Sequence, residues 1–383
     1  MKKSTKYLNI GIFTFGLQKS GVHPLSSLIE CIAPHVNEIY LITGDAGYIH
    51  FKDDKRIKKI YTHNLGLSTP HHKRFVYILI NLPKIAYDFL TIKNIDMWLF
   101  YHGGILLAMP MFIARFLRKK VVYIPTYSAA DTLKETFPSF YKLLDLSLRV
   151  LLDITYLLPH TLILYSPNLI KEWNLEKYKD KILIAHEHFL DFSKFEIKKK
   201  LSERNNLVGY IGRLSEEKGV LNFVKAIPEI LNERDDLEFL IGGDGQLRDE
   251  IEKYINEKNL NDKVKLVGWI PHGNLPDHLN ELKLVVLPSF TEGLPNIMLE
   301  AMACGTPVLA TSVGAISDVI KDGETGFIME NNSPEHIARN VIRILEQPDL
   351  DKIVENARAL VEQEFTYKAV VKRYKKILSE LRG

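Results

Sequence analysis

Two glutamates, Glu292 and Glu300, lie eight positions apart in the stretch of residues 289–308. Glu292 sits in a loop with glycine and proline that follows an apolar run, and Glu300 falls about a turn and a half into the helix expected next. A strand, a glycine-bearing turn and a helix N-terminus together form a common cradle for phosphate. Because carboxylates repel phosphate, we expect this pair to face neutral hydroxyl groups, and sugar hydroxyls fit that description.

Four more apolar runs in the second half of the chain end in loops suited to a ligand. Arg213 and Lys218, two cations five positions apart, follow the first run. The glycine-rich loop 242–245 follows the second and lets backbone approach a ligand closely. Trp269 follows the third, where an apolar wall could flank a nucleobase, and residues 312–315 follow the last. Since ligands of open α/β sheets bind outside the carboxyl ends of the strands, we expect all five loops to line one crevice.

Taken singly, most of these loops have ordinary structural interpretations. A glycine-rich turn follows many strands, two cations at a helix start are often only solvated, and an isolated tryptophan is more often part of a core or its rim. The segment around Glu292 and Glu300 is more specific, because two acids flank a Gly-Leu-Pro turn at a helix N-terminus.

Short apolar runs separated by longer helical patterns predict two α/β halves with mostly parallel sheets and crossover helices. The expected strands of the first half are 8–13, 38–43, 57–62, 97–102, 121–124 and 161–165. Those of the second half are 207–212, 237–241, 264–267, 282–287 and 307–311. The polar, lysine-rich stretch 195–206 is the expected linker. Residues 367–381 are expected to form a charged amphipathic helix.

Length and composition fit two domains of ordinary size. The chain has 383 residues, of which 46% are hydrophobic and 25% charged. Its two cysteines are too few for a disulfide framework and are compatible with a reducing cytosol. The apolar run near the N-terminus loosely resembles a signal peptide, but it is short, ends at Gly16 and lacks a small-residue cleavage site. We therefore expect a first buried strand there.

Charge is distributed unevenly along the chain. Residues 1–200 hold 28 Lys and Arg against 17 Asp and Glu, whereas residues 201–383 hold 22 against 30. A basic first half suggests an anionic partner such as a membrane surface, a lipid phosphate or nucleic acid, unless its cations are merely solvated. The apolar run 105–116, followed by Leu-Arg-Lys-Lys, is too short and too broken by Pro110 to span a bilayer. It either packs on its own sheet or docks on an anionic membrane, and we retain the membrane rather than nucleic acid as the candidate partner.

The second half resembles the nucleotide-sugar-binding domain of glycosyltransferase family 4, a family of retaining enzymes with the GT-B fold. The resemblance rests on the motifs Gly212-Arg213 with Lys218-Gly219, Gly242-Gly243-Asp244-Gly245, Gly268-Trp269, and Glu-Gly-Leu-Pro-Asn-Ile-Met-Leu-Glu-Ala from Glu292. It is dense over residues 206 to about 345, and over 1–195 it is limited to architecture and a few loop positions. It implies two Rossmann-like α/β/α domains facing a central cleft. One would bind the acceptor (1–195), one the nucleotide sugar (206–365), and a last helix (366–383) would cross back to the first.

The same resemblance implies roles for the residues of the second half. Arg213 and Lys218 would neutralise the donor diphosphate. Glu300 would accept hydrogen bonds from the ribose diol, and Glu292 would contact the transferred sugar and stabilise an oxocarbenium-like transition state. Further donor contacts are expected from Gly243, Trp269, Ile270, Gly293, Leu294 and Asn296. The implied activity is that of a retaining hexosyltransferase that uses a nucleotide-diphosphate sugar for cell-surface glycan or glycolipid synthesis, in the cytoplasm or at the inner face of the membrane.

The first half departs from the family pattern at one position. Many members carry a histidine just after the fifth strand to contact the donor sugar, whereas this chain has Thr126 and Tyr127 there. Either of these makes the polar contact, or His102 after the fourth strand supplies an imidazole, unless it only caps or packs there. The loop from Gly16 to Gly21, which includes Ser20, is the expected contact for the acceptor, a sugar or a lipid-linked sugar.

Neither a metal nor a cofactor is expected. Asp349-Leu350-Asp351, the only Asp-x-Asp of the chain, follows no strand and is expected to be a solvated turn. Alternatives are a non-catalytic sugar-nucleotide-binding module and a transferase with a soluble sugar acceptor. A nucleotide-dependent oxidoreductase would need Gly-x-Gly-x-x-Gly after the first strand, which residues 11–21 do not supply. The sequence does not specify the donor base, the donor sugar or the acceptor.

Overall fold

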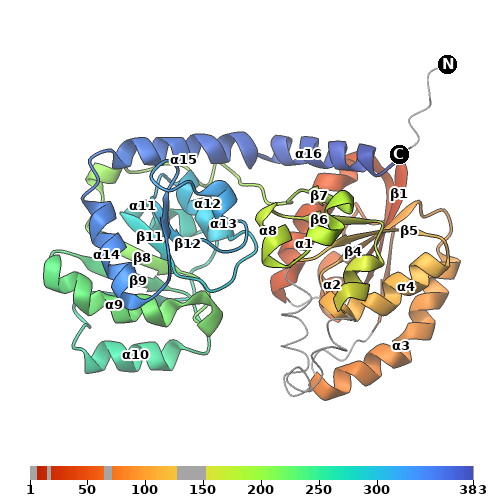
Figure 1. Ribbon diagram of the computed structural model, residues 1–383, viewed down its shortest axis with the longest axis horizontal. Helices are drawn as coiled ribbons and strands as arrows, with labels where there is room; N and C mark the ends of the chain where they lie inside the picture. The colour runs from red at the N-terminus through yellow and green to blue at the C-terminus, as the bar shows by residue number, and fades with distance from the viewer. Residues whose placement is uncertain (1–6, 15–18, 64–70, 127–151, 383) are drawn as a thin grey trace. The chain divides into compact units, whose positions relative to one another are not determined.

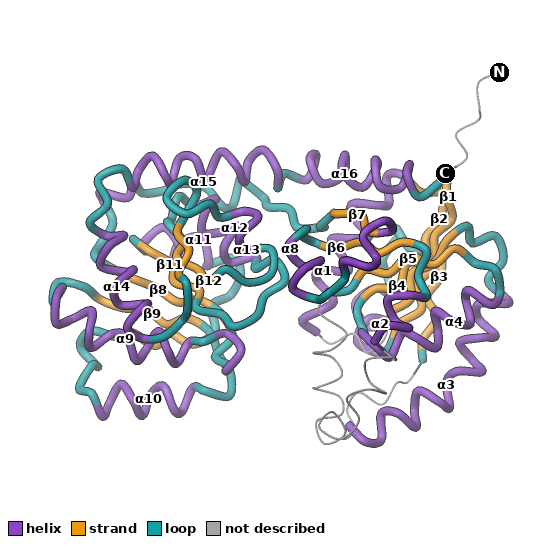
Figure 2. Tube along the Cα trace, in the orientation of Figure 1, coloured by secondary structure: helices purple, strands orange, loops and turns teal. Residues whose placement is uncertain are grey.

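The computed structural model describes residues 7–14, 19–63, 71–126 and 152–382, without the side chains of 19–20 and 71–79. Its contacts divide the chain into two units, Met1–His188 with Val370–Gly383, and Phe189–Ala369. Residues 189–195, expected in the first half, thus belong to the second unit. Each unit contains one sheet with helices around it (Figures 1 and 2).

The first unit is built on a parallel sheet with the strand order β3-β2-β1-β4-β5-β6-β7 in its described part. The central strands β1 and β4 are almost entirely buried, as expected for strands covered on both faces. The strands are β1 (Leu8–Thr14), β2 (Val36–Thr43), β3 (Lys59–Thr62), β4 (Met97–Tyr101), β5 (Lys120–Ile124), β6 (Thr161–Leu164) and β7 (Ile182–Ile184). The helices are α1 (Lys19–Ile32), α2 (Asp45–Phe51), α3 (His71–Thr91), α4 (Ala108–Phe116) and α8 (Asn168–Glu172).

The second unit repeats this plan with the order β10-β9-β8-β11-β12-β13, again parallel. Two hydrophobic cores lie on its two faces, one under α9, α10 and α14 and the other under α11, α12 and α13 (Figure 1). The strands are β8 (Leu207–Ile211), β9 (Glu238–Gly242), β10 (Val264–Gly268), β11 (Leu284–Leu287), β12 (Val308–Thr311) and β13 (Phe327–Met329). The helices are α9 (Val220–Glu233), α10 (Arg248–Glu257), α11 (Leu275–Glu281), α12 (Asn296–Ala303), α13 (Ile316–Val319), α14 (Pro334–Leu345) and α15 (Leu350–Glu364).

The order of strands reverses at one point in each sheet, between β1 and β4 in the first and between β8 and β11 in the second. Such a reversal opens a crevice at the carboxyl ends of the two strands and is where open α/β sheets bind ligands. All eleven strands expected from the sequence are present, within two residues at each end. The strands β7 and β13 were not predicted from the sequence, because they have only three residues each.

The expected linker is packed into the second unit rather than extended. Arg204 is buried, and its guanidinium donates hydrogen bonds to the carbonyl oxygens of Leu282 at 2.9 Å and Cys304 at 2.7 Å and to the hydroxyl of Thr306 at 2.7 Å. These contacts satisfy a cation that would be costly to bury alone. They also fix the chain that enters β8.

A buried carboxylate stands where the chain leaves the first unit. Glu187 Oε1 accepts hydrogen bonds from the hydroxyls of Tyr101 at 3.0 Å and Tyr165 at 2.8 Å. The last helix, α16 (Tyr367–Glu380), adds the buried Tyr374 to this cluster, as its amphipathic pattern predicts. Burial raises the pKa of Glu187 to about 7, although the tyrosine hydroxyls oppose this shift.

Replacing Glu187 by glutamine should remove a pH-dependent loss of stability. The pKa of this carboxyl is about 7 in the folded chain against an ordinary 4.5, so its contribution to stability is complete below pH 4.5 and is lost as the pH rises through 7. The free energy of unfolding of the natural chain, measured against Glu187→Gln in urea, should therefore fall by about 3 kcal/mol between about pH 4.5 and pH 8.

The difference in unfolding free energy between the two proteins reports on Glu187 alone. The neighbouring titratable groups are present in both, namely Cys31, His186, His188, Arg373 and the three tyrosines. Glu38→Gln is the matched control. Hydrogen bonding to Lys58 lowers the pKa of Glu38, so the contribution of this carboxylate to stability should change with pH in the opposite direction. A stability difference between the natural chain and Glu187→Gln that did not change with pH would contradict the assignment.

Candidate functional site

The two loops that carry most of the expected site meet at the strand-order reversal of the second sheet. The loop between β8 and α9 holds Arg213 and Lys218, and the loop between β11 and α12 holds Glu292. Because β8 and β11 are paired neighbours, their carboxyl ends bring both loops to the same edge. The backbone N–H of Phe290 donates to the carbonyl oxygen of Glu217 at 2.9 Å, which joins them directly.

An ion pair links the two loops. Lys218 Nζ lies 2.7 Å from Glu292 Oε1, and the hydroxyl of Ser289 donates to the same oxygen at 2.8 Å. The Glu292 side chain is only 9% exposed and that of Lys218 24%. In such shielded surroundings the pair is screened far less by water than a surface pair, so it holds both side chains in place.

Two glycines allow the loops to approach each other this closely. Gly219 has φ +64°, and a Cβ there would stand 2.0 Å from the carbonyl oxygen of Pro288. Gly314, after β12, has φ +58°, and a Cβ there would stand 2.0 Å from the carbonyl oxygen of Glu292. Both positions combine a left-handed backbone with a contact that no side chain fits. The Glu292 loop is therefore held between its neighbours on both sides.

The remaining loops join the same edge through backbone hydrogen bonds. Leu214 N–H donates to Asp244 at 3.0 Å, and Gly243 N–H donates to Gly268 at 2.7 Å. Together with the contacts of Gly219 and Gly314, these bonds connect all five loops expected to surround one ligand.

Glu300 has a partner that was not predicted from the sequence, His272. The carboxylate is buried on α12, and His272 Nε2 lies 2.9 Å from its Oε1. The His272 ring also lies 5.4 Å from that of Phe195. The hydrogen bond to Glu300 raises the pKa of His272. His272 follows Trp269 by three positions in the loop after β10, and its membership of that ligand loop was the one available signal.

The other expected donor contacts differ in exposure. Arg213 is largely exposed and pairs with Glu217, at 3.1 Å. Trp269 is 76% exposed, and Ile270 packs partly buried against the core. Leu294 is buried, Gly293 accepts a hydrogen bond from Ala315 N–H at 2.8 Å, and Asn296 is the first residue of α12. Arg213 and Trp269 are thus the side chains of this set that are largely exposed to solvent.

In the first unit, His102 follows β4 and lies beside Thr126, which follows β5. The two side chains share a hydrogen bond between Nδ1 and Oγ1 of 2.8 Å, so both candidates stand together. His102 has φ +57°, an uncommon conformation for a residue other than glycine. Burial lowers the pKa of His102 to about 4, so the imidazole is neutral near pH 7. Tyr127 and Gly16 lie outside the described residues, and Ser20 falls in α1 with its side chain not described.

No group of three or more metal-binding side chains occurs among the residues that the structure describes. Asp349 precedes α15, and its carbonyl oxygen accepts a hydrogen bond from Ile353 N–H at 3.2 Å. The thiols of Cys31 and Cys304 are free and buried, and burial raises the pKa of each to about 12. Neither thiol is therefore a candidate nucleophile.

Comparison with known proteins matches residues 191–360 to the family model described as Glycosyl transferases group 1. The alpha-D-kanosaminyltransferase of Streptomyces kanamyceticus is 33% identical over 192 residues, 49% of this chain and 50% of that protein. The N-acetyl-alpha-D-glucosaminyl L-malate synthase of Bacillus anthracis is 26% identical over 352 residues, 90% of each. The chain spans half or less of the length of the first three relatives that it matches, at 50%, 38% and 44%.

Similar solved structures cover nearly the whole chain. Anabaena Alr3699/HepE in complex with UDP has a TM-score of 0.75 at 17% identity and covers 97% of this chain and 100% of that one. Sucrose-phosphate synthase from Thermosynechococcus elongatus has a TM-score of 0.72 at 18% identity and covers 98% and 99%. With two parallel-sheet α/β units in the same chain, these likenesses confirm the expected GT-B fold.

Replacing Gly219 by alanine should separate the loop between β8 and α9 from the loop between β11 and α12. The left-handed backbone and the contact with the Pro288 carbonyl would together cost about 1–3 kcal/mol of unfolding free energy. Urea unfolding measures this loss. Gly273→Ala is the matched control, since a Cβ there would meet no atom within 4 Å. Equal stability of the two variants would show that the loops tolerate separation.

Proposed function

We propose that this chain is a glycosyltransferase that transfers a hexosyl unit from a nucleotide-diphosphate sugar to a hydroxyl acceptor, with retention of the anomeric configuration and without a metal ion. The observation that carries the proposal is the shielded Lys218–Glu292 ion pair at the strand-order reversal of the second sheet, with Glu300 on the helix that follows. The Glycosyl transferases group 1 match, residues 191–360, spans this entire site. Anabaena Alr3699/HepE, whose fold is similar, is described in complexes with UDP and with UDP-glucose.

The ion pair places a cation and a sugar-binding carboxylate side by side. An ammonium group has three donors, so Lys218 can keep its 2.7 Å contact with Glu292 while it binds a phosphate oxygen. Glu292 would then reach the hydroxyls of the transferred sugar and stabilise positive charge that develops at its anomeric carbon. Arg213, exposed and nearby in sequence, would close over the diphosphate from the solvent side.

Glu300 suits the ribose diol because one carboxylate accepts several hydrogen bonds. His272 occupies one position on Oε1, which leaves the other lone pairs of the carboxylate for ribose hydroxyls. We assign His272 a positioning role, since its contact with Phe195 and its bond to Glu300 fix the carboxylate from the solvent side.

The proposed metal independence is supported by the cations of the site. As the nucleotide diphosphate leaves, charge builds on its oxygens, and Lys218, Arg213 and the N-terminal end of α12 supply compensating positive charge there. In the first unit, the neutral imidazole of His102 with Thr126 would serve as a hydrogen-bonding group for the donor sugar rather than as a charge.

A membrane-docking role for α4 forms the second part of the proposal. Met109, Phe112 and Phe116 recur at helical spacing and are 50%, 53% and 78% exposed, while Pro110 and Met111 are buried. Arg115 lies within the span of this apolar stripe, and Arg118 and Lys119 follow it, a combination that binds anionic interfaces. No helix in the described ranges is long and apolar enough to cross a bilayer. The acceptor would then be lipid-linked and delivered at the membrane surface.

Three substitutions separate the donor roles. Glu300→Ala should weaken UDP-sugar binding by about tenfold or more, because hydrogen bonds to a charged group contribute 1.5–3 kcal/mol, and should abolish transfer. Glu292→Gln should lower the transfer rate by about a hundredfold with little change in UDP affinity. Arg213→Ala should mainly weaken diphosphate binding.

A thermal-shift screen of UDP-, GDP-, ADP- and TDP-sugars selects the donor for these measurements, and calorimetry and a transfer assay then quantify them. Glu238→Gln, on the exposed end of β9, is the control for loss of an acid. Wild-type turnover by Glu300→Ala would refute the ribose assignment, and no response to any sugar nucleotide would refute the donor proposal.

Membrane docking is tested by flotation with vesicles. The natural chain should float with vesicles that contain phosphatidylglycerol and not with phosphatidylcholine alone. The double change Phe112→Ser with Phe116→Ser should lower binding by about tenfold or more, since each buried phenylalanine contributes about 1.5–3 kcal/mol. Ile49→Ser, at an exposed position on α2, is the control. Absence of the natural chain from both vesicle fractions would exclude docking.

A further inference from the structure

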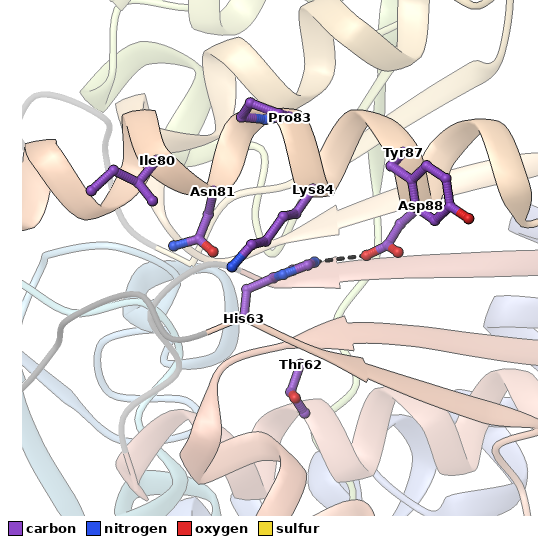
Figure 3. A pocket seen from close by; sticks show the side chains of 8 residues that line it. All are labelled: Thr62, His63, Ile80, Asn81, Pro83, Lys84, Tyr87 and Asp88. Atoms are coloured by element: carbon purple, nitrogen blue, oxygen red, sulfur yellow. Dashed lines mark hydrogen bonds and ion pairs between the residues drawn. The ribbon is translucent and has the colours of Figure 1, made fainter.

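The first unit contains an open cavity of about 600 Å³ that the proposed function does not use. It lies between the carboxyl end of β3 and one face of α3 (Figure 3). Its two buried titratable side chains satisfy each other, because His63 Nε2 lies 2.7 Å from Asp88 Oδ2. The amino-terminal edge of the same sheet differs in this respect, because it gathers several cations whose charge is not balanced in this way.

Three neighbouring strands of the first sheet start at basic residues. Lys120 is the first residue of β5, and His160 and Lys181 directly precede β6 and β7. Because β5 pairs with β6 and β6 with β7, all in parallel, the three side chains come to one edge of the sheet. This edge is opposite to the carboxyl ends of the strands, where His102 and Thr126 stand.

Backbone carbonyl groups hold the cations of this edge in place. Arg115 Nη1, from α4, donates to the carbonyl oxygen of Leu158 at 2.9 Å. Lys181 Nζ donates to the carbonyl oxygens of the two residues on either side of Leu158, at 2.9 Å each. Lys120 Nζ donates to the carbonyl oxygen of Leu381, just after α16. A carbonyl group orients a cation, but it carries no net charge that could neutralise it.

The acids that lie nearby in sequence do not neutralise these cations. Asp153 pairs with Lys177 at 2.6 Å, and Asp180 forms no ion pair with Arg115 or Lys181 in the described part of the chain. Burial and then the charge of Arg115 lower the pKa of Lys181 to about 8. The cations of this edge thus repel one another, and a bound anion would relieve that repulsion.

His160 adds a hydrogen-bond donor beside these charges. Its Nδ1 accepts a hydrogen bond from Val121 N–H at 3.0 Å, so the proton of the neutral ring is on Nε2. Partial burial and then the charges of Arg115, Lys120 and Lys181 lower the pKa of His160, which keeps the ring neutral. Three cations and an N–H donor form a set of groups to which phosphate oxygens bind strongly.

Exposed apolar side chains flank the cations on two sides. Phe112 and Phe116 belong to the exposed stripe of α4, and Ile154 and Leu157 are exposed on the helical stretch 152–157. Leu157 also supplies one of the carbonyl oxygens that bind Lys181, so this second apolar strip adjoins the cations directly. An oxyanion site between two apolar strips fits a lipid with an anionic headgroup, whose acyl chains would lie against the strips.

The turn between α4 and β5 places a further cation here at a conformational cost. Arg118 has φ +57°, a left-handed conformation in which glycine is the favoured residue. Its N–H donates to the carbonyl oxygen of Arg115 at 2.8 Å, which ties the turn to the end of α4. A contribution of Arg118 to anion binding would offset the cost of its backbone conformation.

We propose that Arg115, Lys120, His160 and Lys181 form a phosphate site that binds the headgroup of an anionic phospholipid. The three cations contact the phosphate oxygens, His160 Nε2–H donates to one of them, and Arg118 approaches from the turn. The same cations repel the choline group of phosphatidylcholine, so the site discriminates between the two headgroups. For the source of the lipid, this inference rests on the membrane docking proposed for α4, to which it adds a defined headgroup contact.

Short-chain lipids below their critical micelle concentration test the site without a membrane. The full chain should bind dihexanoyl phosphatidylglycerol saturably, and about tenfold more tightly than dihexanoyl phosphatidylcholine or inorganic phosphate. Arg115→Gln and Lys181→Gln should each weaken this binding about fivefold to tenfold, because glutamine keeps a donor for the carbonyl oxygens and removes the charge. Lys177→Gln is the matched control and should change nothing, because Asp153 already neutralises Lys177.

Arg118→Gly distinguishes a role in binding from a structural role. Glycine adopts the left-handed conformation without strain, so the change should not lower the urea midpoint of unfolding. It should nevertheless weaken binding to vesicles that contain phosphatidylglycerol by about fivefold. Natural affinity in all three variants, Arg115→Gln, Arg118→Gly and Lys181→Gln, would overturn the proposal.

The two lipid assays also separate this inference from the docking proposal. If the natural chain floats with anionic vesicles but does not bind dihexanoyl phosphatidylglycerol, α4 docks and the phosphate site is overturned. If the chain floats with neither kind of vesicle but binds the short-chain lipid, and Lys181→Gln loses this binding, the docking proposal fails and the phosphate site stands. Equal affinity for inorganic phosphate and for the short-chain lipid would overturn the assignment to a lipid headgroup.

Discussion

The second unit depends on keeping a carboxylate and an ammonium group in contact at the reversal of its sheet. Lys218 and Glu292 come from loops that are far apart in sequence, and only the pairing of β8 with β11 makes them neighbours. An ion pair as shielded as this one is expensive to assemble from separate charges, so the fold has to hold both ends firmly. Gly219 and Gly314 contribute to this because they place no side chain at the two contacts that flank the Glu292 loop. The contacts that hold this edge of the sheet in place thus also hold the charge pair in place.

Much of this arrangement could be predicted from the periodicity of apolar residues and from the glycine and proline residues at turns. Apolar runs separated by helical patterns predicted the strands. The amphipathic repeat predicted the last helix to within one residue of α16. The glycine and proline residues around Glu292 and Glu300 marked the site, because turns at strand ends leave a strong local signature. Each of these patterns lies within a short segment of the chain, so it can be recognised without any knowledge of the fold.

What escaped prediction depends on partners that are distant in sequence. His272 carries no pattern of its own, and its relevance follows only from Glu300, 28 positions away. The pairing of Lys218 with Glu292 was not predicted either, because the two residues lie 74 positions apart in the sequence. Arg204, in a segment that looked like a linker, is buried because the carbonyl oxygens it needs are brought there by α11 and α12. The cavity beside His63 likewise exists only once β3 and α3 are packed together.

The two thiols give the folded chain an exterior without reactive sulfhydryl groups. The sequence contains only Cys31 and Cys304, and both are buried and protonated over the whole physiological range. A cysteine introduced at an exposed position of either unit would therefore react with maleimide dyes far ahead of the native pair. Donor and acceptor fluorophores can thus be attached to one unit each in an otherwise natural chain. The separation of the two units then becomes a quantity that single-molecule spectroscopy can follow during turnover.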